Sequence, residues 1–248
     1  MFKAEDVLGS QEHLSPRRRV KVDKRTGAVY VWELPVRVYH WVNAISIFIL
    51  AFTGFYIGNP WWQAGSDEAY YSMLMGWMRY VHFFAAYTFV ICFLVRSYWA
   101  IKGNIHSFPH IHKKEYWKNL FQMLKFYLFI DRKHEPHYGH NALAYTSYIV
   151  FVILGSIIMI LSGFFMLAEP QLETSILGSL FGWLMTWGGS FVVRSLHHWV
   201  AWLFLIFAVI HIYMAFRQDW LDKDGTMSSI FSGYKVPQEH HDDHGKKH

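Results

Sequence analysis

The sequence predicts an all-α integral membrane protein with four transmembrane helices. Of its 248 residues, 53% are hydrophobic and 19% aromatic, whereas only 17% are charged, against about 25% in ordinary globular proteins. The apolar residues are concentrated in long uncharged runs. Twelve Trp and fifteen Tyr suit the two water interfaces of a bilayer, where these residues collect. This pattern argues against a soluble globular domain.

Four stretches are long enough to cross a membrane, which requires about 20 mainly apolar residues. We expect spans at about 38–58, 80–101, 141–168 and 195–216. Only Arg96 interrupts them, near the end of the second span, where its side chain can snorkel. Ile176–Trp187 would reach only about 18 Å as a helix, so we interpret it as a surface or re-entrant segment. Residues 116–130 contain two lysines in an apolar stretch and are predicted to form an interfacial amphipathic helix.

The distribution of Lys and Arg predicts that both termini are cytoplasmic. Residues 1–37 carry eight of these cations, the loop between the second and third spans carries seven, and the segment from Arg217 onward carries five. The other two loops contain only Arg79 and Arg194. Because cytoplasmic loops are enriched in Lys and Arg, the pattern requires an even number of spans. It divides the chain into a cytoplasmic N-terminal segment (1–37), a membrane domain (38–217) and a cytoplasmic tail (218–248).

Four histidines stand in the predicted spans at two depths. His82 and His197 lie at the outer ends of their spans, and His40 and His211 lie near the cytoplasmic ends. His197 and His211 are 14 residues apart, close to four full turns, so they face one side of a helix about 21 Å apart. Ionisable groups inside a bilayer are costly and usually functional, and His is a common haem ligand. We therefore expect two bis-histidine haem sites in a helical bundle, His82/His197 outside and His40/His211 inside.

A bond between helices is the alternative role for any single one of these histidines. Four histidines that pair by depth are harder to explain in that way. His198 adjoins His197 but is rotated from it by about 100°. Only one of the two can face the same cofactor, and the 14-residue spacing selects His197.

Three of the four histidines have an Arg three residues earlier, on the same helical face. These residues are Arg37, Arg79 and Arg194. They would point toward the headgroups, where charge-assisted pairs with haem propionates are expected. The alternative is that they are interfacial or positive-inside arginines.

Several segments resemble the b-type cytochrome subunit of membrane-bound nickel–iron uptake hydrogenases. They are Val36–Trp41, Thr53–Gly58, Arg79–Phe83, Gly139–Asn141, and His211–Ala215 followed by Arg217. The resemblance runs from about residue 29 to residue 234. The cytochrome subunit of respiratory formate dehydrogenase is similar at the positions of the four span histidines.

The resemblance implies two b haems with the same pairing of histidines. It also implies a quinone site at Gly139, His140 and Asn141, where an Asn amide and a backbone N–H can bond quinone carbonyls. A helix N-cap is the alternative role for Asn141. Electrons would come from the iron–sulfur relay of a periplasmic hydrogenase, made of a small and a large subunit, and would leave to quinone.

The resemblance places the chain in the bacterial cytoplasmic (inner) membrane, as part of a respiratory chain, with lipid around it and no nucleic-acid partner. A higher oligomer of the complex is compatible with the resemblance, and the sequence does not decide the oligomeric state. Hydrogen chemistry would belong to the partner subunits and quinone reduction to this chain. The alternatives are the cytochrome b subunit of another respiratory enzyme, acting on formate or thiosulfate, and a haem-free membrane anchor or transporter. The His-rich tail, 240–248, and the loop residues His106, His110 and His112 are expected to be solvated, and weak metal binding is the alternative for both groups.

Overall fold

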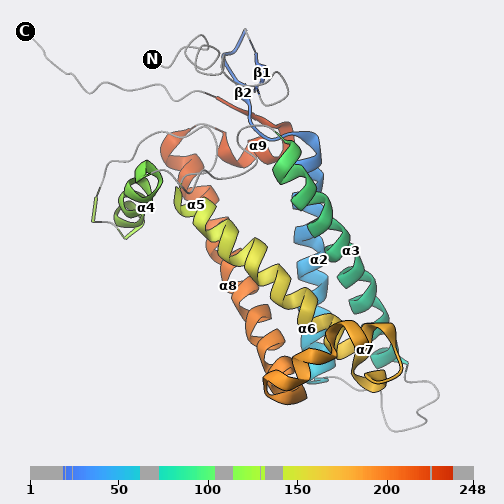
Figure 1. Cartoon of the computed structure of the whole chain (residues 1–248). Coiled ribbons are helices and arrows are strands. Elements are labelled where there is room, and N and C mark those ends of the chain that lie inside the picture. The colour runs from blue at the N-terminus through green and yellow to red at the C-terminus, as the bar shows by residue number, and fades with distance from the viewer. Residues whose placement is uncertain are drawn as a thin grey trace, which may run out of the picture. The chain divides into compact units, whose positions relative to one another are not determined.

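The computed structural model describes residues 19, 21–23, 25–61, 73–103, 114–128, 130–131, 142–223 and 225–236. The chain divides into two units. Unit 1 comprises Met1–Arg37, Tyr98–Thr146 and His211–His248, and unit 2 comprises Val38–Ser97 and Ser147–Ile210. The long helices supply most of unit 2, whereas unit 1 contains a small sheet and short helices (Figure 1).

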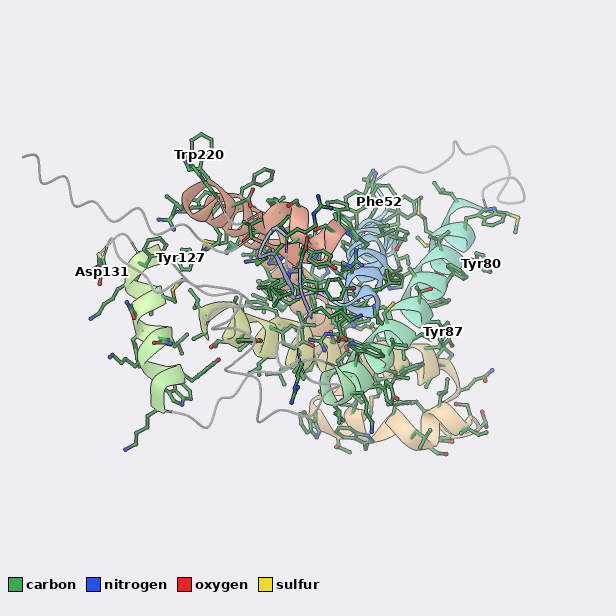
Figure 2. The ribbon with its side chains drawn as sticks, turned by 90° about the horizontal axis from the view of Figure 1, so that it is seen from above. Phe52, Tyr80, Tyr87, Tyr127, Asp131 and Trp220 are labelled. Carbon is green, nitrogen blue, oxygen red and sulfur yellow. The ribbon has the colours of Figure 1, made fainter. Side chains whose placement is uncertain are left out.

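Four helices in the described part of the chain are long and apolar enough to cross a membrane, as predicted. They are α2 (Leu34–Gly58), α3 (Leu74–Lys102), the continuous helical stretch Ala142–Gln171, and α8 (Gly189–Asp222). Only 11–22% of the most apolar part of each helix is buried. Phe48, Tyr80 and Val209 are 73%, 64% and 70% exposed, and Tyr80 points outward from α3 (Figure 2). Side chains this apolar and this exposed suit contact with lipid.

The helices extend beyond the apolar runs that predicted them. Helix α3 begins at Leu74 instead of Tyr80, and α8 begins at Gly189 instead of Ser195. Hydropathy marks only the apolar part of a helix, whereas backbone hydrogen bonds continue through polar and aromatic residues at its ends. Consequently His82 and His197 are separated from the first residues of their helices by about two turns.

The third spanning stretch changes its helical form along its length. It consists of α5 (Ala142–Ser147), a π-helical segment (Tyr148–Gly155), α6 (Ser156–Ala168) and a 3₁₀ turn (Glu169–Gln171). A π-helical segment is rare and is often found at functional sites. The sequence did not predict this irregularity.

Unit 2 has a core to which all four helices contribute. Phe89 of α3 packs with Val200 and Phe204 of α8, and apolar residues of α2 and α6 surround this cluster. A second cluster joins Phe165 of α6 to Leu184 and Val193. These contacts hold the helices that carry His82 and His197.

The short apolar segment between the third and fourth spans is helical. It forms α7 (Ile176–Phe181) and then a 3₁₀ turn (Gly182–Trp187). The Ser175 hydroxyl accepts a hydrogen bond from the backbone N–H of Gly178 at 2.9 Å and so caps α7. Gly188 and Gly189 have φ values of 125° and 78°, which glycine adopts readily, and the chain turns there into α8.

In unit 1, segments from near the two ends of the chain form an antiparallel three-stranded sheet. Its order is β1 (Lys21–Val22), β2 (Val29–Tyr30) and β3 (Tyr234–Lys235), and Val29 pairs with Lys235. Val29, Val31 and Trp32 form a buried cluster. The Trp32 indole N–H donates to the Ser229 hydroxyl in α9 (Thr226–Ser232) at 3.0 Å. This pairing was not anticipated from sequence.

A helix is present where the amphipathic one was predicted, namely α4 (Lys114–Tyr127). The Tyr127 hydroxyl donates to the side chain of Gln218 at 2.9 Å, and Arg217 lies 4.6 Å from the centre of the Phe126 ring. Met123 and Phe126 are buried. Within unit 1, α4 therefore packs against the C-terminal end of α8. Its position at a membrane interface stays a prediction.

Candidate haem-ligand site

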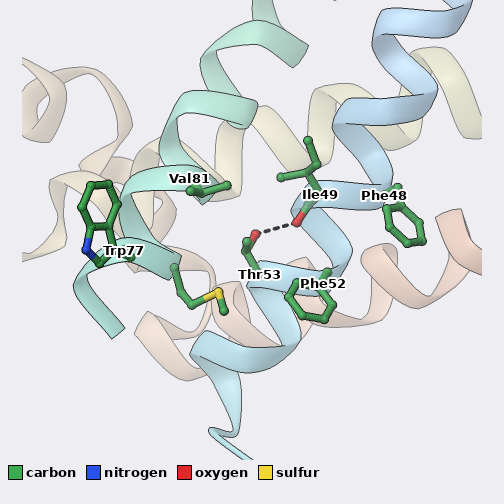
Figure 3. A pocket seen from close by; sticks show the side chains of 7 residues that line it. Phe48, Ile49, Phe52, Thr53, Trp77 and Val81 are labelled. Carbon is green, nitrogen blue, oxygen red and sulfur yellow. Dashed lines mark hydrogen bonds between the residues drawn. The ribbon is translucent and has the colours of Figure 1, made fainter. Parts of the chain in front are cut away.

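His82, in α3, contacts a buried hydroxyl of α2. Its Nδ1 atom lies 2.9 Å from the hydroxyl oxygen of Thr53. The same hydroxyl donates to the carbonyl oxygen of Ile49, one turn earlier, at 2.7 Å (Figure 3). Thr53 is only 3% exposed. The ring of His82 is therefore tied to the adjacent helix through a side chain that water does not reach.

His197, in α8, has the same arrangement with α6. Its Nδ1 atom lies 2.8 Å from the hydroxyl oxygen of Ser162. That hydroxyl donates to the carbonyl oxygen of Ile158 at 2.6 Å, and Ser162 is 3% exposed. The two histidines thus use the same kind of partner, although they lie on different helices and contact different neighbours.

A glycine follows each of these hydroxyl residues and faces the same imidazole. A Cβ atom on Gly54 would lie 3.2 Å from Cε1 of His82, and one on Gly163 would lie 3.6 Å from Cε1 of His197. Each ring therefore lies against the backbone of the neighbouring helix. Gly155 differs, because a Cβ there would meet the ring of Phe204 at 3.1 Å, which indicates ordinary helix packing.

His82 and His197 both belong to unit 2, on helices α3 and α8, which pack against each other through Phe89 and Val200. Two imidazoles in a bundle, each with one ring nitrogen engaged by a hydroxyl, are a donor set that fits the axial ligation of a b-type haem. The glycines beside them favour the same role, because they let each ring sit close to a helix backbone. The residues present therefore fit the cofactor that the sequence predicted.

His198 has a different environment from His197. It is exposed, and its Nε2 atom accepts a hydrogen bond from the Trp202 indole N–H at 3.2 Å. The Phe55 ring meets it edge-on, at 5.4 Å between ring centres. The lone pair of Nε2 is thus already engaged, which supports the selection of His197 as the ligand.

The other two predicted ligands fall in different units. His40 is a half-buried residue of α2 in unit 2, with its ring 5.2 Å from that of Trp41. His211 is an exposed residue of α8 in unit 1. The pairing of these two histidines stays a prediction from sequence.

Two of the three arginines predicted to meet haem propionates have protein partners. Arg194 forms an ion pair with Glu169 and donates to the Ser190 hydroxyl at 3.0 Å. Arg37 donates to the backbone carbonyl of Phe231 and lies near the Tyr30 hydroxyl. Arg79 is exposed on α3. The propionate role of all three stays a prediction, and any such role for Arg194 has to compete with Glu169.

The predicted quinone residues Gly139, His140 and Asn141 lie outside the described residues. So do His106, His110 and His112 and the tail from residue 237.

Sequence reasoning missed the packing of three polar residues in the spans of unit 2. Thr53 and Ser162 were not singled out, although each directly precedes a glycine in an apolar run. Arg96 was expected to snorkel, but it is only 9% exposed and lies 5.0 Å from the centre of the Tyr148 ring, at the start of the π-helical segment. A cation buried within a span is costly, and contact with an aromatic face offsets part of that cost.

An apolar groove of about 310 Å³ runs between α2 and α3 (Figure 3). Within the described part of the chain, its lining comes from these two helices and consists of Phe48, Ile49, Phe52, Thr53, Trp77, Met78 and Val81. Thr53 carries the one hydroxyl among them, and this hydroxyl is engaged by Ile49 and His82. The groove therefore offers a hydrophobic surface next to the His82 support.

Residues 31–233 match the family described as prokaryotic cytochrome b561. The chain is also similar to curated proteins named probable Ni/Fe-hydrogenase B-type cytochrome subunit. It is 39% identical to the one from Cupriavidus necator over 86% of this chain and 89% of that protein. It is 35% identical to the one from Rhodobacter capsulatus over 95% and 90% of the two chains. The Ni/Fe-hydrogenase 1 subunit of Escherichia coli K12 is 32% identical over 83% and 90%.

The match covers all four spanning helices and the four span histidines. Membership in a cytochrome b family implies a b-type haem. The four apolar helices and this family together make the chain an integral membrane protein. The chain belongs to the prokaryotic cytochrome b561 family, in the group that includes the Ni/Fe-hydrogenase B-type cytochrome subunits.

Proposed function

We propose that the chain is the di-haem b membrane subunit of a periplasmic nickel–iron hydrogenase and carries electrons from that enzyme to quinone. The names of the relatives support the hydrogenase assignment, at 32–39% identity over most of the chain. Partner subunits would oxidise hydrogen to two protons and two electrons. A quinone would take up two electrons and two protons to become a quinol. Haem, when bound, supplies one-electron transfer, while the protein positions and tunes it.

The matched pair of His82 and His197 is the observation that carries this proposal. The two histidines lie on different helices, α3 and α8, which pack against each other through Phe89 and Val200. His82 contacts a buried hydroxyl and a glycine of α2. His197 contacts a buried hydroxyl and a glycine of α6. A bond between helices would explain one such histidine, but it does not explain why two should have the same support. If both histidines hold one haem, the outer haem, the shared support is explained.

A second haem, the inner haem, is proposed at His40 and His211. The 14 residues between His197 and His211 within the continuous helix α8 support it, because that spacing brings two residues to one helical face. One helix can then supply a ligand to each of two haems.

The Lys and Arg distribution supports a direction for this electron path. With 1–37, the loop after the second span and 218–248 on the cytoplasmic side, His82 and His197 would lie toward the periplasm. The hydrogenase small and large subunits would dock there. Quinone would react near the opposite face, at Gly139, His140 and Asn141, and would take its protons from the cytoplasm. The bacterial inner membrane is the location that fits this arrangement.

One purification tests the proposal. The chain is isolated with its partners from native membranes in mild detergent, the partners are identified by mass spectrometry, and hydrogen is added without oxygen. We expect hydrogenase subunits and a reduced b-type absorption band that appears on addition of hydrogen. Formate dehydrogenase or thiosulfate reductase subunits in their place would replace the hydrogenase assignment. The absence of any b-type band from the intact complex would contradict the haem assignment and favour an anchor or transporter.

A further inference from the structure

Thr53 and Ser162 are two buried hydroxyls that share one geometry. Each lies within hydrogen-bonding distance of Nδ1 of a histidine and of the carbonyl oxygen four residues earlier in its own helix. We infer that these hydroxyls hold His82 and His197 in the tautomer protonated on Nδ1, so that Nε2 of each ring is the atom presented to the haem iron. The inference rests on the proposed outer haem and names the positioning residues of that site.

The direction of the hydrogen bonds follows from the number of protons available. A hydroxyl has one hydrogen to donate, and a carbonyl oxygen can only accept. The hydroxyls of Thr53 and Ser162 lie 2.7 Å and 2.6 Å from the carbonyls of Ile49 and Ile158, distances at which the hydrogen must lie between the two oxygens. Each hydroxyl therefore has only lone pairs left for the imidazole. The imidazole must donate, and the proton is on Nδ1.

The tautomer decides which nitrogen can bind a metal. A neutral imidazole protonated on Nδ1 has its lone pair on Nε2. Metal-binding histidines usually donate their other ring N–H to an acceptor, which fixes the ring orientation and raises the basicity of the ligand. Thr53 and Ser162 supply that acceptor from the neighbouring helices. Their burial, at 3% exposure each, keeps water from competing for the same N–H.

The glycine contacts restrict the same rings independently. Gly54 and Gly163 face Cε1, the ring carbon between the two nitrogens. With Nδ1 held by the hydroxyl and Cε1 against the helix backbone, a ring flip would put Cδ2 in the place of Nδ1 and Nε2 in the place of Cε1, and the hydrogen bond would be lost. Each two-residue unit, Thr53-Gly54 on α2 and Ser162-Gly163 on α6, therefore fixes both the proton and the plane of its imidazole.

This arrangement has a consequence for the iron. A histidine that donates from Nδ1 is a stronger electron donor through Nε2 and stabilises the ferric state. Removal of either hydroxyl should therefore raise the midpoint potential of the outer haem and weaken its retention. Loss of such a partner typically reduces metal affinity 10–100-fold. Because both hydroxyls act on one haem, the effects of the two substitutions on the midpoint potential and the retention of that haem should add.

The test uses Thr53→Val and Ser162→Ala in the intact complex. Matched controls are Thr88→Val and Ser46→Ala, since these hydroxyls donate to the carbonyls of Phe84 and Val42 at 3.0 Å and 2.8 Å. Redox titration followed by visible absorption and electron paramagnetic resonance gives the potentials. Transfer to an excess of a haem-scavenging apoprotein gives the retention. We expect one of two haems to shift to higher potential and to leave about 10–100-fold faster, with the controls unchanged.

Thr53→Ser keeps the hydroxyl and should restore the wild-type potential. If Thr53→Val loses the outer haem altogether, retention in Thr53→Ser supports the role of the hydroxyl, whereas equal loss in both overturns it. Shifts no larger than those of the controls would also overturn the inference, as would shifts that fall on different haems in the two variants. Failure of the proposed function has a different result in the wild-type complex, which would then show either no b-type band or the subunits of another enzyme in place of the hydrogenase.

Discussion

Replacement of Gly54 by alanine places a methyl group 3.2 Å from Cε1 of His82. Two carbon atoms prefer a separation of about 3.5–4.0 Å, so the ring must move away by a few tenths of an ångström. That movement acts directly on a Thr53–His82 contact of 2.9 Å. In a ring that is also bound to iron, such a movement has to be absorbed by the hydrogen bond or by the iron ligation.

The expected result for Gly54→Ala is weaker retention of one b haem and an altered spectrum of that haem. The backbone itself favours the substitution, because alanine is better than glycine within a helix by about 1 kcal/mol. A loss of haem therefore cannot come from a weaker helix. The assay is the haem content of the purified complex, together with its reduced absorption band and its thermal unfolding.

Gly163→Ala and Gly76→Ala are the matched controls. A Cβ on Gly163 would meet His197 at 3.6 Å, an ordinary contact, and one on Gly76 in α3 would meet nothing within 4 Å. We expect Gly76→Ala to keep its haems and to be at least as stable as the wild type, and Gly163→Ala to lose less haem than Gly54→Ala. The reasoning fails if Gly54→Ala binds haem like the wild type, or if Gly163→Ala is as disruptive as Gly54→Ala.

Three further predictions concern other contacts. His198→Ala should retain every haem in the absorption spectrum, because its Nε2 is engaged by Trp202; loss of a haem would exchange the roles of His197 and His198. Trp32→Phe removes a buried hydrogen bond worth about 0.5–1.5 kcal/mol and should speed proteolysis of unit 1, whereas Trp220→Phe, at a residue 82% exposed, should not. Glu169→Gln breaks the pair with Arg194, whose side chain is 57% exposed, and should lower thermal stability by less than about 1 kcal/mol; a larger loss would indicate a buried ionic network.

The spanning helices could be predicted from sequence because the bilayer imposes a length and a composition on them. Uncharged runs marked all four, and the structure adds the helical ends that lie outside the apolar core. The sheet of unit 1 could not be predicted in the same way. Its strands are two residues long, and Val29 pairs with Lys235 at the other end of the chain. Strands this short, paired with residues this far away in the sequence, show no alternation of apolar and polar residues that would reveal them.

The histidines could be predicted because each is a polar residue in an apolar run. Thr53 and Ser162 carry a weaker signal, since hydroxyls are common in spanning helices, where they donate to their own backbone. Their roles depend on which helix face meets His82 or His197, and this is a property of the packed bundle. Burial of Arg96 beside Tyr148 depends on packing for the same reason.

His82 and His197 are proposed to bind one and the same haem. The number of haems per chain in purified wild type, His82→Ala, His197→Ala and the double variant tests this proposal most directly. We predict two haems in the wild type and one in each of the three variants. Each single substitution removes the outer haem, so the double substitution has no further haem to remove. A double variant without any haem, next to single variants that each keep one, would contradict the pairing.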